Sequence, residues 1–268
     1  MKLFYNESEI DYSNNRKYAF LNWHFDNGNG SNDKCNPNQT VFDNFEMGKA
    51  HLANAILTLH SIVYTSNGLD QADLLIFPVL FNAWHSIELL LKSGINALSI
   101  LNGGDLAKLN HDIYTLKDTF ADALINAGMD TTVKNTLCDV NNLLSEFSRV
   151  GAHFDFARYT FDSKGNYQFY NSPYSDSKQW QRKPPRINGK IVPNTCIDIE
   201  ALFKLLWDIG FSFKELIFYL TCCISENEKP SDDRFDQFKN TKLSEDDNVI
   251  KEKDPLIKIV NYIYMYIL

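Results

Sequence analysis

Residues 74–120 read LLIFPVLFNAWHSIELLLKSGINALSILNGGDLAKLNHDIYTLKDTF, and this stretch decides the fold. It contains a long apolar helix, a double-glycine break and the start of a second helix. His85, Glu88 and Lys92 are three and four residues apart, so they share one face of the first helix. The remaining faces are apolar, which predicts a central helix in a bundle with one charged stripe.

Apolar residues at helical spacing predict four further helices around this one. The predicted helices cover about residues 44–64, 74–101, 112–126, 131–149 and 198–225. Asp43 or Asn44 is the expected cap of the first helix, and Asp198 that of the last. Short connections between such helices are typical of a bundle, so the expected fold class is mainly α.

The other segments have compositions that differ from the bundle. Residues 1–43 are expected to form an irregular segment that packs on the body. An insertion at about 154–197 should hold a β-hairpin within 154–170 and a long irregular loop, and a second hairpin around Asn188-Gly189 is compatible with the sequence. The charged stretch 226–254 is predicted to be a solvated linker or a partly disordered segment. The run 255–268 is predicted to be an apolar helix that needs a groove on its own body or on a second copy.

Composition and charge limit the functions open to the chain. Its 268 residues can bury a sizeable core in one large or two modest domains. A formal net charge of -8 argues against a broad nucleic-acid surface, although a local basic pocket stays compatible with it. The five cysteines show neither a disulfide framework nor zinc-ligand spacing, so we expect a reducing compartment, no metal and no cofactor. Without a leader or an uninterrupted apolar run long enough for a bilayer, the protein is expected to be cytoplasmic, outside membranes.

Three short motifs occur in a fixed order along the chain. HSIELLLK at 85–92 is followed by NHDIYTL at 110–116 and by ARYTFD at 157–162. An H-x-x-E-x-x-x-K helix, an H-D-L-x-x-L helix start and an R-Y-P-D-like turn resemble the HEPN superfamily of bacterial and archaeal helical domains, with Thr160 where the family usually has Pro. The resemblance spans about residues 45–165. It implies a helical bundle that usually dimerises and, in active members, cuts RNA.

Arg149 and His153 are similar to the R-x(4 to 6)-H element of active HEPN domains. In that role Arg149 would bind the scissile phosphate with its guanidinium fork, and His153 would transfer protons at the 2′-hydroxyl without a metal. Three residues separate the two here, one fewer than in the family element. This spacing keeps both on one helix face, but Gly151 weakens the helix between them. Activity and loss of activity therefore both stay open.

The stripe of His85, Glu88 and Lys92 also has two interpretations. A carboxylate beside an imidazole and an ammonium can support a general base or frame a phosphate. The same trio can be an internal network that fixes the helices in register. In the catalytic interpretation, His85 and Glu88 belong to the catalytic site and Lys92 binds substrate.

His111 is a further candidate for substrate binding. It precedes a helix start where Asn110 or Asp112 can cap the exposed amides, or where the helix N-terminus can bind phosphate. Of the other histidines, His51 and His60 lack the carboxylate or cysteine neighbours of a metal site, so we expect them to be core or surface residues.

The remaining candidates follow the bundle in the chain. Arg158 and Tyr159 match the family's turn. A basic and aromatic cluster at 174–190, which includes Arg182 and Lys183, suits a single-stranded RNA surface, although such a loop can equally be solvated.

Two functions of different classes are compatible with these features. The first, implied by the resemblance, is a metal-independent endoribonuclease of the toxin or antiphage-defence type, a homodimer with an antitoxin or defence-system protein as partner. The second is a non-catalytic HEPN-like module that binds a partner protein or a nucleotide, with the charged stripe as a structural network.

Overall fold

The computed structural model describes residues 37–64, 68–149, 186–187, 190–191 and 197–246. The described elements are α1 (Pro37–Tyr64), α2 (Gly68–Leu101), α3 (Ile113–Asn126), α4 (Asp130–Arg149), β1 (Arg186–Ile187), β2 (Lys190–Ile191), α5 (Ile199–Glu226) and α6 (Asp232–Asp246). All of them belong to the compact unit Cys35–Leu268, and the chain's other unit, Met1–Lys34, lies outside the described residues. The mainly α fold class predicted from the sequence is confirmed, as a helical bundle.

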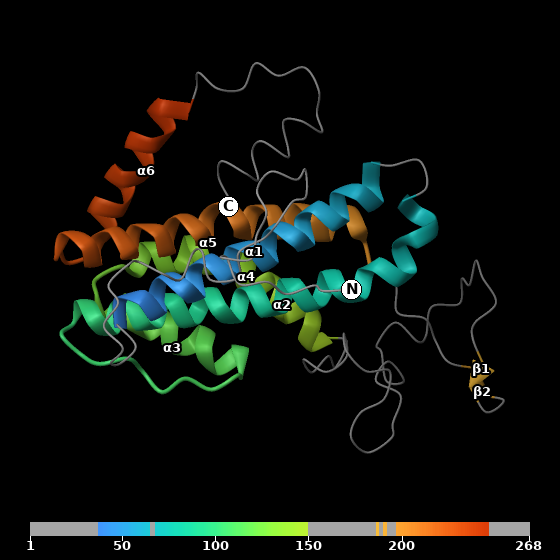
Figure 1. Cartoon of the computed structure of the whole chain (residues 1–268), viewed down its shortest axis with the longest axis horizontal. Coiled ribbons are helices and arrows are strands. Elements are labelled where there is room, and N and C mark those ends of the chain that lie inside the picture. Colours follow the sequence, from blue (N-terminus) through green and yellow to red (C-terminus); the bar gives the residue numbers. More distant parts are fainter. Residues whose placement is uncertain (1–36, 65–67, 150–185, 188–189, 192–196, 247–268) are drawn as a thin grey trace, which may run out of the picture. The chain divides into compact units, whose positions relative to one another are not determined.

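Helix α2 is the centre of this bundle, as its apolar circumference predicted. It contacts α1 most extensively and also α3 and α5, and α5 in turn contacts α1, α4 and α6. Figure 1 shows α1, α2 and α5 running alongside one another. Most side chains from Val79 to Leu98 are buried, including the polar Ser86, Ser93 and Asn96. The charged stripe therefore belongs to a helix that is covered on most sides.

A glycine on α2 lets two other helices approach its backbone. A Cβ atom added at Gly94 would lie 2.4 Å from Cε2 of Phe120 on α3 and 2.7 Å from Cδ1 of Ile217 on α5. Because both distances are shorter than van der Waals contact, a side chain at this position would displace the aromatic ring or one of the helices. Gly94 is two residues from Lys92, so close packing and the polar stripe share the same part of α2.

The helix ends agree with the predicted capping signals. Asp112 caps α3 by accepting a hydrogen bond from the Tyr114 N–H at 3.1 Å, and Asp198 caps α5 by accepting one from the Ala201 N–H at 3.0 Å. Gly103 follows α2 with φ of 74°, and Gly128 follows α3 with φ of 77°. These left-handed conformations end the two helices where the sequence predicted.

The predicted start of the first helix is wrong. Helix α1 begins at Pro37 rather than near residue 44, so Asp43 and Asn44 are interior residues and not caps. Asp43 instead accepts a hydrogen bond from Gln39 Nε2 at 2.6 Å, one helical turn away. Val41 is fully buried one turn before Phe45 and extends the apolar face toward the N-terminus. Proline suits the first helical position because its missing N–H would have no intrahelical partner.

The predicted linker at 226–254 is wrong over residues 232–246, which form α6. Two aromatic residues anchor this polar helix. The ring centroid of Phe235 lies 5.2 Å from that of Tyr219 on α5, and the centroid of Phe238 lies 5.8 Å from that of Phe218. The segment has few large apolar residues, but these few pack against α5 and hold the helix there.

Other predictions of secondary structure fall mostly on residues that are not described. The hairpin within 154–170, the segments 1–36 and 247–268 and most of the loop 171–196 lie outside the described residues. Strands β1 and β2 pair antiparallel, Arg186 opposite Ile191 and Ile187 opposite Lys190, around residues 188–189.

Helix α2 also has the length and composition of a membrane-spanning helix, which was not predicted from the sequence. Over Ala72–Leu101 it is long and apolar enough to cross a membrane by length and composition, and 56% of its most apolar window is buried inside the protein. The stretch includes Asp73, Glu88 and Lys92, so it contains no uninterrupted apolar run of that length. A buried core helix of a soluble protein meets the same criterion.

Candidate functional site

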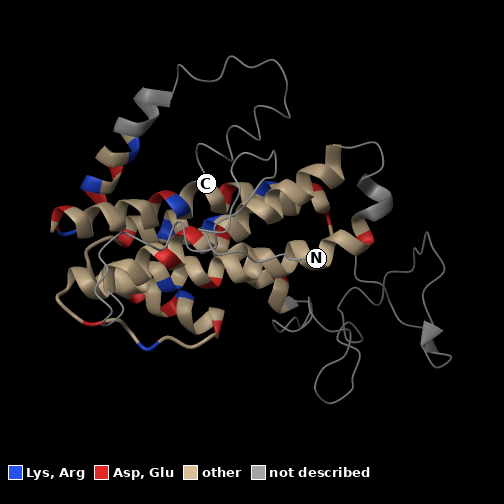
Figure 2. Cartoon of the chain, in the orientation of Figure 1, with Lys and Arg blue, Asp and Glu red and all other residues tan. Residues whose placement is uncertain are grey.

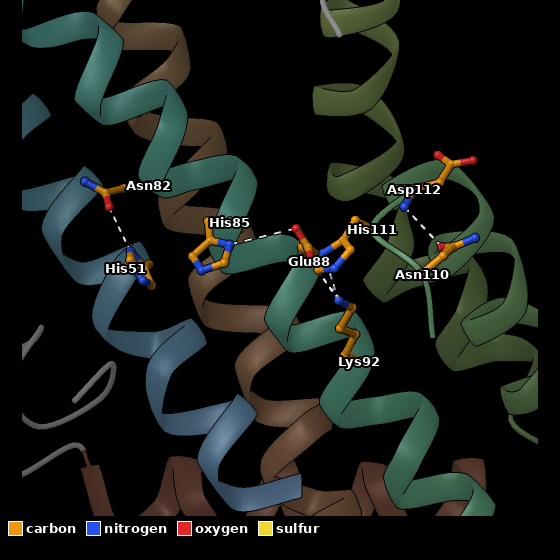
Figure 3. A network of polar contacts seen from close by, with 8 residues as sticks. All are labelled: His51, Asn82, His85, Glu88, Lys92, Asn110, His111 and Asp112. Carbon is orange, nitrogen blue, oxygen red and sulfur yellow. Dashed lines mark hydrogen bonds and ion pairs between the residues drawn. The ribbon is translucent and has the colours of Figure 1, made fainter. Parts of the chain in front are cut away.

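The predicted stripe on α2 exists, and Glu88 is its centre. Lys92 Nζ lies 2.7 Å from Glu88 Oε1, and His85 Nδ1 lies 3.8 Å from Glu88 Oε2. Only 5% of the Glu88 side chain is exposed. Figure 3 shows the three side chains along one face of α2, as the spacing of three and four residues predicted.

The loop before α3 brings a second histidine to the same carboxylate. His111 Nδ1 lies 2.7 Å from Glu88 Oε1 and 3.3 Å from Lys92 Nζ, although 87% of the His111 side chain is exposed. Figure 3 shows His111 reaching Glu88 from the loop, with Lys92 next to both side chains. The sequence motifs at 85–92 and 110–116 therefore meet at Glu88, a pairing across 23 residues that helical spacing alone does not reveal.

The environment of Glu88 favours its charged form. Burial alone raises the pKa of this carboxyl, but the hydrogen bonds from Lys92 and His111 and the electrostatic attraction of these two groups outweigh burial, so the pKa of Glu88 lies below its ordinary value. The site therefore holds a buried carboxylate at neutral pH, with an ammonium and an imidazole as its partners.

The loop between α2 and α3 is fastened to α2 at two further points. Ser99 Oγ donates a hydrogen bond to the Asp105 carbonyl at 2.6 Å, and the Ala107 N–H donates one to Asn96 Oδ1 at 3.1 Å. With the contact between Glu88 and His111, these bonds hold the loop along α2. The loop that carries His111 is thus held along α2 at Asp105 and Ala107 as well as through Glu88.

Helix α1 contributes a histidine that the sequence did not assign to the site. His51 Nδ1 lies 2.8 Å from Asn82 Oδ1 on α2, and its ring meets that of His85 edge-on with centroids 4.6 Å apart (Figure 3). Because His51 lacks the acidic or cysteine neighbours of a metal site, the sequence predicts only a core or surface residue. His60 is in the core, one of the two predicted alternatives. It is buried beside Tyr64 and Phe203, and burial lowers its pKa.

The last turns of α4 lie next to the stripe. The ring centroids of Trp84, which precedes His85, and Phe147 are 5.2 Å apart. Tyr114, near the start of α3, donates a hydrogen bond from its hydroxyl to the Leu144 carbonyl at 3.3 Å. Because α4 ends at Arg149, two residues after Phe147, the helix that carries Arg149 ends beside α2 and the start of α3.

The N-terminus of α3 is already occupied by its own cap. Besides the Tyr114 N–H, Asp112 accepts a hydrogen bond from Thr115 Oγ1 at 2.6 Å, and the Asp112 N–H donates to Asn110 Oδ1 at 3.1 Å. The bond from Thr115 lowers the pKa of Asp112 most, against a smaller opposing effect of burial. A carboxylate at this end disfavours a second anion, so the capping interpretation holds better than a phosphate-binding helix terminus.

Several predicted site residues cannot be placed in this geometry. His153, Arg158, Tyr159, Arg182 and Lys183 lie outside the described residues, and Arg149 is described as the last residue of α4. Of the described residues, no three histidine, cysteine, aspartate or glutamate side chains come together as a metal site.

Comparisons of the chain with protein-family models, with curated proteins and with solved structures give no match. The site is therefore interpreted from its own contacts, in which Glu88 joins α2 to the start of α3 beside the end of α4.

Proposed function

We propose that the chain is a HEPN-like protein that cleaves RNA without a metal ion, of the toxin or antiphage-defence type. One observation carries the proposal: the contact between Trp84 and Phe147 brings the end of α4 against the part of α2 that holds His85 and Glu88. Arg149 is the last residue of α4, and in this proposal it meets the substrate that touches the histidines. The resemblance of residues 85–92 and 110–116 to family motifs supports the same assignment.

In this proposal each side chain has a separate task. Arg149 holds the scissile phosphate through its guanidinium fork, and His153 serves as general acid or base. Lys92 and His111 line the substrate side of Glu88, and His85 lies beside the same carboxylate. Arg158, Tyr159, Arg182 and Lys183 extend the RNA contact. A homodimer and an antitoxin or defence-system partner belong to the same proposal.

The test is cleavage of labelled single-stranded RNA by the purified full chain in excess EDTA. We expect Arg149→Ala and His153→Ala each to slow cleavage by roughly 100-fold or more, with an unchanged melting temperature. Arg234→Ala is the matched control. Arg234 belongs to α6 and pairs with Glu228, and α6 contacts the end of α4 opposite Arg149. Full activity of His153→Ala, or no cleavage by the wild-type chain, contradicts the proposal.

The second candidate is a non-catalytic HEPN-like module that binds a partner protein or a nucleotide. The observation in its favour is that Glu88 already has two close partners, Lys92 and His111, so the stripe is well satisfied as an internal network. In that case the wild-type chain does not cleave RNA, and Glu88→Ala lowers the melting temperature sharply. A melting temperature of Glu88→Ala equal to that of the wild type speaks against this candidate.

A further inference from the structure

We infer that His111 and Glu88 form a proton-transfer pair, in which His111 exchanges protons with substrate through Nε2 and Glu88 is its positioning residue. RNA as the substrate rests on the proposed function, whereas the pair itself is an inference from the contacts of His111. The sequence assigned His111 only to substrate binding or capping.

The contacts at His111 Nδ1 decide which nitrogen carries the proton. A carboxylate oxygen can only accept, so the distance of 2.7 Å to Glu88 Oε1 requires a proton on Nδ1. The alternative donor, Lys92 Nζ, is farther from Nδ1 at 3.3 Å and lies 2.7 Å from Glu88 Oε1, to which it donates. The neutral imidazole then has its lone pair on Nε2.

The two ends of the pair lie in different environments. The Glu88 side chain is 5% exposed and that of His111 is 87% exposed. In the part of the chain that the structure describes, the contacts of His111 with Glu88 and Lys92 are both made through Nδ1, which leaves Nε2 toward solvent. A buried carboxylate that fixes one nitrogen of an accessible imidazole is the arrangement by which proteins orient a general base.

His85 is the weaker candidate for this task, although it lies beside the same carboxylate. Its Nδ1 is 3.8 Å from Glu88 Oε2, beyond hydrogen-bond distance, and its side chain is 28% exposed. Its ring is further enclosed by Phe81 in a stacked contact at 5.9 Å and by His51 edge-on. Substrate therefore reaches His111 more easily than His85.

On RNA, the step would be balanced as follows. Nε2 of His111 takes the proton of the 2′-hydroxyl, the 2′-oxygen forms a bond to phosphorus, and the bond from phosphorus to the 5′-oxygen breaks. The leaving 5′-oxygen takes a proton from water, so the products are a 2′,3′-cyclic phosphate and a 5′-hydroxyl. The imidazolium formed is stabilised by Glu88 and returns its proton to solvent. No metal ion or redox partner is required.

The first test measures the pair without RNA. In the full chain with nitrogen-15 in its histidines, long-range proton–nitrogen correlation spectra report the tautomer of each ring. We expect the neutral form of His111 to carry its proton on Nδ1, with the resonance assigned by its loss in His111→Ala. A proton on Nε2 overturns the inference, whatever the outcome of the RNA experiment.

The second test uses cleavage of single-stranded RNA. His111→Ala should lower kcat roughly 100-fold with little change in KM, and Glu88→Gln should lower it about 10-fold. Added imidazole should restore part of the activity of His111→Ala but none of that of Arg149→Ala. Asn110→Ala is the matched control, since it alters the same loop without touching Glu88.

The outcomes separate the two proposals. Lack of cleavage by the wild-type chain overturns the proposed function. The tautomer of His111 still shows whether His111 and Glu88 form the inferred pair. Active wild type with an unaffected kcat in His111→Ala overturns proton transfer by His111. A loss of activity in Asn110→Ala equal to that in His111→Ala, without rescue by imidazole, also overturns it, because loop structure would then explain both.

Discussion

Asp232, at the start of α6, caps the N-terminus of α4 through Thr132, one hundred residues earlier in the chain. One carboxylate oxygen of Asp232 accepts hydrogen bonds from the Thr132 N–H at 3.0 Å and from the Thr132 hydroxyl at 2.6 Å, and the other accepts one from the Thr131 N–H at 3.0 Å. An aspartate from a distant helix thus performs the task that a helix's own first residue usually performs.

Removal of this cap should destabilise the bundle. We expect Asp232→Ala to lower the free energy of unfolding by about 1 kcal/mol, the usual cost of losing an N-cap, and Asp232→Asn to cost less. Burial raises the pKa of Asp232, but the bonds from Thr132 and Thr131 lower it to a net value below 3.8. The cap's contribution is therefore full above pH 3.8 and is lost as the pH falls through the folded-state value. Urea unfolding from pH 3 to 7 measures both effects, and equal stability of all three proteins would contradict the assignment.

Tyr219 on α5 binds the backbone of Ser231, the residue before α6. Its hydroxyl accepts a hydrogen bond from the Ser231 N–H at 3.1 Å and donates one to the Ser231 carbonyl at 3.4 Å. Tyr219→Phe should cost about 1 kcal/mol, because the Ser231 backbone loses its partner. Burial raises the pKa of Tyr219 to about 12, so the alkaline absorbance difference between wild type and variant should titrate near that pH. A difference that titrates near pH 10 would contradict the buried environment.

Gly94 should not tolerate even the smallest side chain. Alanine favours helices over glycine by about 1 kcal/mol, so propensity alone predicts a more stable protein. The added methyl group would meet Phe120 and Ile217 at distances below 3 Å, and overpacking of this kind costs about 1–3 kcal/mol. We therefore expect Gly94→Ala to lower the melting temperature, as measured by circular dichroism. A higher melting temperature would show that α3 and α5 can move apart without cost.

The contacts of Glu88 with Lys92 and His111 should make the free energy of unfolding depend on pH in the acidic range. The folded state lowers the pKa of Glu88, so its contribution is complete above the ordinary value of 4.5 and is lost as the pH falls through the folded-state value. Glu88→Gln should cost about 2 kcal/mol at pH 7, because Lys92 and His111 lose a charged acceptor. The cost should shrink below pH 4. Denaturant unfolding of both proteins across this range measures it, and a constant difference would argue against an ionised Glu88.

Much of the bundle could be predicted from local patterns. The apolar periodicity of α2 to α5 and the caps at Asp112 and Asp198 depend on residues close in sequence, and the structure agrees with them. The start of α1 was placed seven residues late because composition favoured a loop, although Val41, one turn before Phe45, carried the helical signal.

Helix α6 could not be found in the same way. Its hydrophobic signal is carried by Phe235 and Phe238, and its stability depends on partners on α4 and α5 that are distant in sequence. Composition therefore indicated a solvated segment.

For the site, the stripe on α2 followed from spacing alone, whereas its partners did not. The contact of His111 with Glu88 spans 23 residues, and that of His51 with Asn82 spans 31. Helical spacing reports neighbours three or four residues apart, and only packing determines which loop or helix faces them. Charge alone does not identify the site either. Figure 2 shows acidic and basic residues throughout the bundle, so their distribution does not single out Glu88.

The three hydrogen bonds that hold the loop before α3 along α2 also affect the order of folding. Its three bonds join residues 6, 11 and 23 positions apart, so each closes a short segment of chain at a low entropic cost. Helices α2 and α3 can therefore pair before α5 arrives from a hundred residues downstream. We expect Asn96→Ala to slow refolding more than it speeds unfolding, which stopped-flow kinetics can measure.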